Sequence, residues 1–259
     1  MKTRICCIVF LCCAVCMLLG ACRRSVPAMA DPASGAGRAS QLPSRESETE
    51  SVTEEPDDGI PTICIDPGHG FGDLGTDSAY LGDLSEKDIT LDIALHLRRE
   101  LESRGFHVIL THDGESFPRA DNDDGNNLFR PQERIAYAKT LDIDYYFSIH
   151  CDSYDGDSTV NGVRVYYSAD TPYTKESAKA AEKIRDAINE AMPDMKKTVI
   201  KEMSNASAYY VIREAPVPSA LIEVGFVTSP LDAGLMLDAS WRAAIAVGIA
   251  DGIEAYLGS

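Results

Sequence analysis

Short apolar runs that alternate with longer amphipathic segments dominate the chain from residue 60 to residue 257. The runs are four to six residues long and rich in Val, Ile, Tyr and Phe, as strands are. They are TICI at 62–65, FHVIL at 106–110, YYFSI at 145–149, GVRVYY at 162–167, AYYVI at 208–212 and SALIEV at 219–224. Six strands are therefore expected.

The segments between these runs have helical spacing. In residues 85–103, apolar side chains recur at every fourth position: Ile89, Ile93, Leu97 and Leu101. Comparable patterns predict helices at 131–139, 174–191 and 241–256. Strands that alternate with helices predict an α/β fold: a single domain with a mixed, mostly parallel twisted sheet flanked by helices on both faces.

The N-terminal residues have a different composition. Residues 1–21 have a short basic start and then an apolar run, which is typical of a secretory signal peptide and short for a membrane-spanning helix. The run ends in LGAC, which resembles a bacterial lipobox and predicts lipidation of Cys22. Cleavage by ordinary signal peptidase and an uncleaved anchor remain alternatives. We expect an extracytoplasmic lipoprotein, anchored to a membrane of the cell envelope.

Residues 22–59 are rich in Ser, Glu, Pro, Ala and Asp, which predicts a disordered acidic linker before a domain at 60–259. The formal net charge of −17 argues against nucleic-acid binding through phosphates. Of the eight cysteines, only Cys64 and Cys151 fall in the domain, so no disulfide framework is expected. Both are expected to be small buried residues, with a single disulfide between them left open.

A glycine pattern follows the first predicted strand. Gly70, Gly72 and Gly75 form G-x-G-x-x-G, but a dinucleotide site requires this turn to open a helix directly. Here the helix begins only at Ser85, which forms a capping pair with Asp88. The nucleotide interpretation is therefore rejected. The loop 113–130 faintly resembles a calcium loop but lacks its closing glutamate, so we expect a solvated acidic loop.

Three residues favour a metal site instead. His69 stands between two glycines at the end of the first strand, Glu86 opens the capped helix, and His150 directly follows YYFSI. Groups at the carboxyl ends of neighbouring strands converge on one crevice of an open α/β sheet. Two histidines and one carboxylate are the ligand set of a catalytic zinc ion with a free fourth position.

Glu223, at the end of an apolar strand, is a candidate base for a metal-bound water. Each of these residues also has an ordinary structural interpretation. His69 would be a turn residue, His150 a core histidine, Glu86 a first-turn acid, and Glu223 a partner of Arg213. The coincidence of four such residues at strand ends or at a helix start favours the site.

Four segments together resemble the zinc-dependent N-acetylmuramoyl-L-alanine amidases of the Amidase_3 type, over residues 61–257. They are ICIDPGHGFGDLGT, SEKDITLDIALHLRRELESRGFHVILTHD, PQERIAYAKTLDIDYYFSIHCD and AYYVIREAPVPSALIEVGFVTSP. The resemblance implies one catalytic zinc held by His69, Glu86 and His150, with Glu223 as catalytic residue. It implies hydrolysis of the amide between N-acetylmuramic acid and L-alanine in peptidoglycan. Arg213 matches an arginine near the groove of the family; substrate contact and salt bridging both remain open.

Some positions depart from the family pattern. His112 stands in place of a common arginine, Phe71 in place of a frequent glycine, and Cys151 in place of a small residue. The segments between motifs are too short for the plugging helix of some relatives, so we predict no obligatory activator. Two rivals remain: a non-catalytic peptidoglycan-binding lipoprotein, and a zinc hydrolase that cuts a different peptidoglycan bond.

Overall fold

The computed structural model describes residues 58–118, 127–204 and 207–258. The predicted signal peptide, Cys22 and nearly all of the linker lie outside the described residues, as does the middle of the acidic loop. Within the described residues a six-stranded sheet has the order β2-β1-β3-β6-β4-β5. The strands are β1 (Thr62–Pro67), β2 (His107–Leu110), β3 (Tyr145–Asp152), β4 (Arg164–Ser168), β5 (Val199–Met203) and β6 (Ser219–Phe226).

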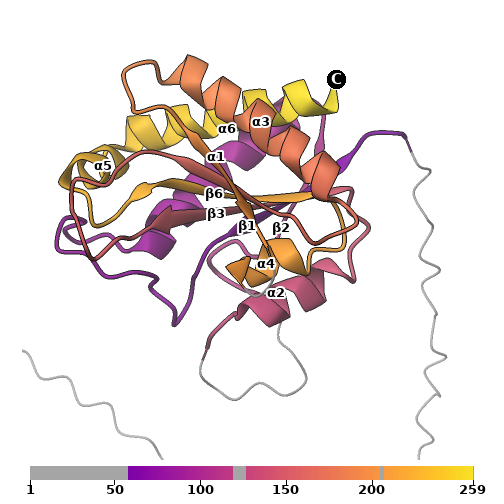
Figure 1. Ribbon diagram of the computed structural model, residues 1–259. Coiled ribbons are helices and arrows are strands. Elements are labelled where there is room, and N and C mark those ends of the chain that lie inside the picture. The colour runs from indigo at the N-terminus through magenta and orange to yellow at the C-terminus, as the bar shows by residue number, and fades with distance from the viewer. Residues whose placement is uncertain (1–57, 119–126, 205–206, 259) are drawn as a thin grey trace, which may run out of the picture. The chain divides into compact units, whose positions relative to one another are not determined.

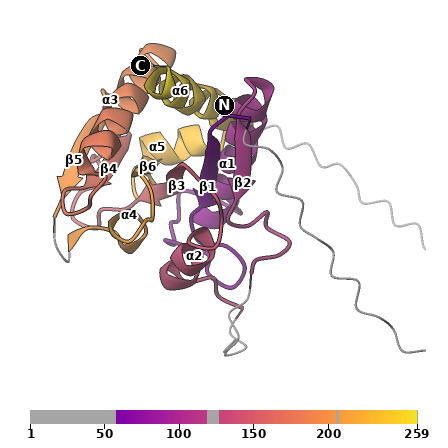
Figure 2. The same cartoon turned by 90° about the vertical axis from the view of Figure 1, so that its right-hand side faces the viewer.

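Strand direction divides the sheet into two parts. Strands β2, β1, β3 and β6 are parallel to one another. Strand β4 runs antiparallel to β6 and parallel to the edge strand β5. Figure 2 shows the strands from β5 at the left to β2 at the right. The sheet is therefore mixed and mostly parallel, as predicted.

Helices cover both faces of the sheet (Figure 1). One face carries α1 (Glu86–Ser103), α3 (Thr174–Ala191), α5 (Pro230–Met236) and α6 (Ala239–Leu257). The opposite face carries two short helices, α2 (Pro131–Ala138) and α4 (Tyr210–Arg213). The predicted fold class is confirmed, and the residues that form it belong to one compact unit.

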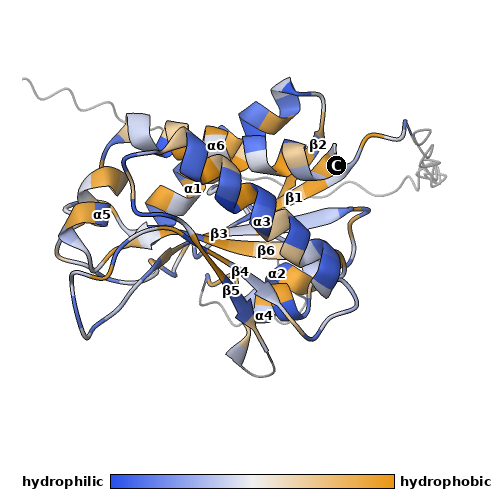
Figure 3. Cartoon of the chain, turned by 45° about the horizontal axis from the view of Figure 1, so that its top comes forward, coloured by the Kyte–Doolittle hydropathy of each residue, from blue (hydrophilic) through white to orange (hydrophobic). Residues whose placement is uncertain are grey.

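The alternation of side chains along each strand explains the two cores. In β1, Ile63 and Ile65 pack with the long helices, while Cys64 faces α2 and α4. Every residue of β6 is buried, as expected for a strand covered on both faces. Figure 3 shows the matching hydropathy: α6 is largely hydrophobic, whereas α3 alternates between hydrophobic and hydrophilic residues. Cys64 and Cys151 lie in different cores and are free, buried thiols.

The segment AYYVI was wrongly predicted to be a strand. It enters α4, because a short apolar run is equally compatible with a buried helical turn. Adjacent Val211 and Ile212 both pack into the smaller core, whereas neighbours in a strand would point to opposite faces. Strand β5 and helix α5 were not predicted. The α5 helix nevertheless has a readable start, since Ser229 caps it and Pro230 is its first residue.

The remaining predicted elements are confirmed within a few residues. Helix α1 begins at Glu86 after the N-cap Ser85, whose backbone N–H donates to Asp88 Oδ2 at 2.8 Å. Among the described residues, each helix taken alone is too short or too polar to cross a membrane. Only α5 and α6 together, bent by 89°, pass that test of length and composition.

Candidate active site

Three side chains meet at the carboxyl ends of β1 and β3. His69 follows β1, Glu86 is the first residue of α1, and His150 lies near the end of β3. One ligand atom from each lies within 4.8 Å of the other two. Glu86 Oε1 is 3.1 Å from His69 Nε2 and 3.3 Å from His150 Nδ1. The structure therefore brings the three predicted metal ligands together.

The glycines after β1 are explained by close approach to these ligands. A Cβ atom at Gly68 would lie 2.5 Å from His150 Cε1, and one at Gly75 would lie 2.6 Å from Glu86 Oε2. His69 itself has a φ of 61°, in the left-handed region that side chains other than glycine seldom adopt. The unusual backbone conformation of His69 thus places its imidazole over the crevice.

Hydrogen bonds orient the ligand atoms. Asp73 Oδ2 lies 2.8 Å from His69 Nδ1, which leaves Nε2 directed at Glu86. A carboxylate behind a histidine is the usual support of a metal-bound imidazole. Glu86 Oε2 accepts the backbone N–H of Thr76 at 2.7 Å, and Oε1 accepts that of Cys151 at 2.9 Å.

The electrostatics of the cluster suit a divalent metal. Burial acts to raise the pKa of Glu86, but the hydrogen bonds and the charges of His150 and His69 together outweigh it and hold that pKa below its usual value. The carboxylate is therefore in its ionised, ligating form. Two imidazole nitrogens, one carboxylate oxygen and a supporting carboxylate fit a metal ion that prefers nitrogen and oxygen ligands.

Glu223 lies beside this cluster on β6. Its Cα is paired in register with that of His150, so both side chains emerge from the same face of the sheet. Only 4% of Glu223 is exposed, and its Oε2 has no hydrogen-bond partner among the described residues. Burial raises the pKa of Glu223 well above its usual value, and the charges of Asp152 and Glu86 raise it further.

Arg213 has other contacts than those considered from the sequence. Its Nε donates to Glu214 Oε1 at 3.0 Å and its Nη1 to the Ala208 carbonyl at 3.3 Å. Its guanidinium also lies 5.3 Å from the ring centre of Tyr210. The salt bridge of Arg213 is therefore with Glu214 rather than Glu223, and its contact with substrate stays a prediction.

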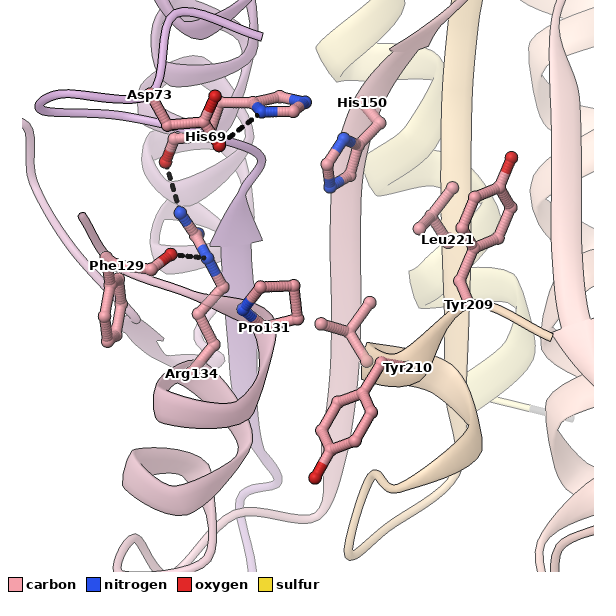
Figure 4. Close-up of a pocket in the computed structure, with 10 residues that line it drawn as sticks. His69, Asp73, Phe129, Pro131, Arg134, His150, Tyr209, Tyr210 and Leu221 are labelled. Carbon is pink, nitrogen blue, oxygen red and sulfur yellow. Dashed lines mark hydrogen bonds and ion pairs between the residues drawn. The ribbon is translucent and has the colours of Figure 1, made fainter. Parts of the chain in front are cut away.

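A cavity of about 110 Å³ opens between α2 and α4 beside the two histidines. In Figure 4, Pro131 and Arg134 form one wall and Tyr209, Tyr210 and Leu221 form the other, with His69 and His150 at one end. The lining is mostly apolar apart from the two histidines, Asp73 and Arg134.

Two polar residues around the cluster were not singled out from the sequence. Asp73 hydrogen-bonds to the ring of His69. In the sequence, the only indication of this contact was that Asp73 is a carboxylate four positions after His69 in the same turn. Arg134 donates to the backbone carbonyl of His69 and to Asp66. No signal in the local sequence distinguished Arg134 from an ordinary charged residue of a short helix.

Comparisons with known proteins agree with this geometry. The sequence model of the family described as N-acetylmuramoyl-L-alanine amidase, Amidase_3, matches residues 63–255. The probable cell wall amidase LytH of Staphylococcus epidermidis is 29% identical over 198 residues, which cover 76% of this chain and 59% of that protein. The N-acetylmuramoyl-L-alanine amidase LytC of Bacillus subtilis is 32% identical over 196 residues, or 75% of this chain and 35% of that protein.

A solved structure shares the fold. The N-acetylmuramoyl-L-alanine amidase AmiC2 of Nostoc punctiforme has a TM-score of 0.64 and 30% identity, and the match covers 77% of this chain and 98% of that one. The chain thus spans about three fifths of LytH and about one third of LytC. Because the family match contains the three clustered residues and Glu223, and extends over most of the described domain, this chain belongs to the Amidase_3 family of N-acetylmuramoyl-L-alanine amidases.

Proposed function

We propose that this chain is a zinc-dependent cell-wall hydrolase that cuts the amide between N-acetylmuramic acid and L-alanine in peptidoglycan. The observation that carries this proposal is the position of Glu223. A buried carboxyl group with one unpartnered oxygen stands next to a cluster of two histidines and a carboxylate. A merely structural carboxyl group would be expected to have partners for both oxygens.

His69, Glu86 and His150 would hold the zinc ion, with Asp73 fixing the tautomer of His69. Bound zinc supplies a Lewis acid that polarises the scissile carbonyl and lowers the pKa of water. Glu223 takes a proton from the water as the water oxygen attacks the carbonyl carbon. It then delivers that proton to the L-alanine nitrogen as the carbon–nitrogen bond breaks, which leaves a lactyl carboxyl group and a free stem peptide.

The open cavity beside the histidines supports a substrate larger than a water molecule. We propose Arg213 as a substrate contact near this groove and Cys22 as the site of a lipid anchor in the cell envelope. We also propose that the enzyme acts without an obligatory activator.

The test is mass spectrometry of purified peptidoglycan after incubation with the chain, with and without a zinc chelator. We expect free stem peptides that begin with L-alanine, and none in the chelated sample. Products with a different new terminus would assign the hydrolysis to another bond. Retention of the chain on sacculi without any cleavage, in both samples, would favour a peptidoglycan-binding protein and overturn the proposal.

A further inference from the structure

The buried side chain of Arg134 connects α2 to the turn that carries His69. Only 3% of Arg134 is exposed, and its guanidinium points from α2 toward this turn (Figure 4). Nη2 donates to the backbone carbonyl of His69. Nη1 donates to the Pro67 carbonyl at 2.6 Å and to Asp66 Oδ1 at 2.7 Å. Nε donates to the Phe129 carbonyl at 2.9 Å.

The turn needs such support, because its backbone is strained. His69 and Phe71 have φ angles of 61° and 57°, in the left-handed region. Residues in this region persist only where their surroundings hold them. The two backbone–backbone hydrogen bonds within the turn join Gly70 and Asp73 and do not involve the main chain of His69. The donor that reaches the carbonyl of His69 comes from Arg134.

We propose that Arg134 is a positioning residue of the metal site. Its planar fork fixes the main chain on both sides of Gly68, at Pro67 and His69, and so aims the His69 imidazole at Glu86 and His150. Asp73 orients the same residue through its ring, whereas Arg134 acts through its backbone. This inference rests on the proposed function only in taking the three-residue cluster as a zinc site.

A lysine cannot replace this arrangement. Its single ammonium group lacks the rigid fork that presents several N–H groups in one plane to separate acceptors. It does retain a positive charge beside Asp66, so the buried carboxylate keeps a counter-charge. Arg134→Lys therefore separates the geometric role from the role of charge in the core.

Arg242 offers a matched control on the opposite face of the sheet. Its Nε donates to Asp92 Oδ2 at 2.5 Å, and its Nη1 donates to the Met236 carbonyl at 2.7 Å. Like Arg134, it joins a carboxylate and a backbone carbonyl, but it touches none of the three clustered residues.

The experiment measures the zinc dissociation constant of the purified chain by competition with a chromophoric chelator. We expect Arg134→Lys to keep its near-ultraviolet circular dichroism and to bind zinc about tenfold more weakly, or worse, as for other supports of metal ligands. Arg242→Lys should bind zinc like the wild type. The double variant Asp66→Asn/Arg134→Met removes both charges of the pair. Its zinc affinity should be reduced as much as that of Arg134→Lys.

The outcomes separate the possibilities. Wild-type zinc affinity in Arg134→Lys would overturn the positioning role, and so would loss of its native dichroism, which would assign Arg134 to the core alone. Wild-type affinity in the double variant would show that the effect passes through the charge of Asp66, which also overturns it. A wild-type chain without zinc affinity would instead remove the proposed function, and this inference with it.

Discussion

Asp66 and Glu223 are buried carboxyl groups on the same face of the sheet, separated by β3, but their surroundings are opposite. Asp66 accepts hydrogen bonds from Thr111 Oγ1 at 2.6 Å, Arg134 Nη1 at 2.7 Å and Ser148 Oγ at 2.8 Å. Burial acts to raise the pKa of Asp66, but the charge of Arg134 and the hydrogen bonds from Thr111, Arg134 and Ser148 together outweigh it and lower that pKa to about 2.

Glu223 lacks a full set of donors, and the charge of Arg164, its partner in register on β4, does not offset the effect of burial on its pKa. Its Oε2 is unpartnered among the described residues, and burial raises its pKa. The difference shows two uses of the same chemical group. A carboxylate with every oxygen satisfied stabilises the fold, whereas a carboxyl group left with free acceptor capacity is available for proton transfer.

The largest effect is expected on turnover when Glu223 is changed to Gln. Loss of a general base lowers the rate by about 10²–10⁴-fold. The free energy of unfolding should stay the same or rise, because the amide needs no ionisation in a buried position. Peptide release and thermal unfolding measure the two effects, with zinc content as the control. Near-normal turnover in the variant would remove the role given to Glu223.

Asp66→Asn should lower stability, in contrast to Glu223→Gln. It leaves the charge of Arg134 buried without its counter-ion, which costs about 3–5 kcal/mol of unfolding free energy. Urea denaturation measures this loss. Asp92→Asn is the control, because it breaks the partly exposed pair of Asp92 with Arg242 and should cost about 1 kcal/mol or less. Equal losses in both variants would contradict the comparison.

The same contrast predicts how the free energy of unfolding depends on pH. The pKa of Asp66 is lowered in the folded state, so its contribution is present above the unfolded pKa of about 4 and is lost as the pH falls toward about 2. The wild type should lose about 2 kcal/mol through this group over that window. Asp66→Asn should lack this part of the loss. Parallel curves for the two proteins would show that Asp66 is not the titrating group.

The smallest effect on stability is expected at Arg213, which contacts neither Asp66 nor Glu223. Its half-exposed pair with Glu214 contributes about 1 kcal/mol or less. As a substrate contact, Arg213→Met should raise KM by roughly tenfold with kcat little changed. Glu214→Gln, which breaks the pair but keeps the arginine, is the control. An unchanged KM in Arg213→Met would remove the substrate role.

Much of the fold was predictable because burial leaves a strong pattern. Strands β1, β3 and β6 are apolar on both faces, and α1 combines a capping pair with a regular stripe. Strand β5 was missed because its sequence, VIKEM, is mostly exposed at the edge of the sheet. The α4 segment was misassigned because four residues are too few to reveal a period.

The cluster was predictable for a related reason: the carboxyl ends of parallel strands share one edge of the sheet, so His69 and His150 were expected at the same edge, and the adjacency of β1 and β3 brings them together. Its supports were not. The contact of Arg134 with His69 joins residues 65 positions apart, and nothing in either local sequence marks the pair. A candidate ligand can be predicted from its position at the end of a strand. A residue that supports it, such as Arg134, depends on how separate elements pack.

The position of β6 has a consequence for the newly made chain. Among the described residues it is the last strand in sequence, yet it lies inside the sheet, between β3 and β4. Glu223 therefore reaches His150 only after the C-terminal part of the chain has been synthesised and inserted between strands made much earlier. A nascent or truncated chain that ends before β6 contains His69, Glu86 and His150 but lacks Glu223, the proposed base, so we expect it to be inactive whether or not it binds a metal.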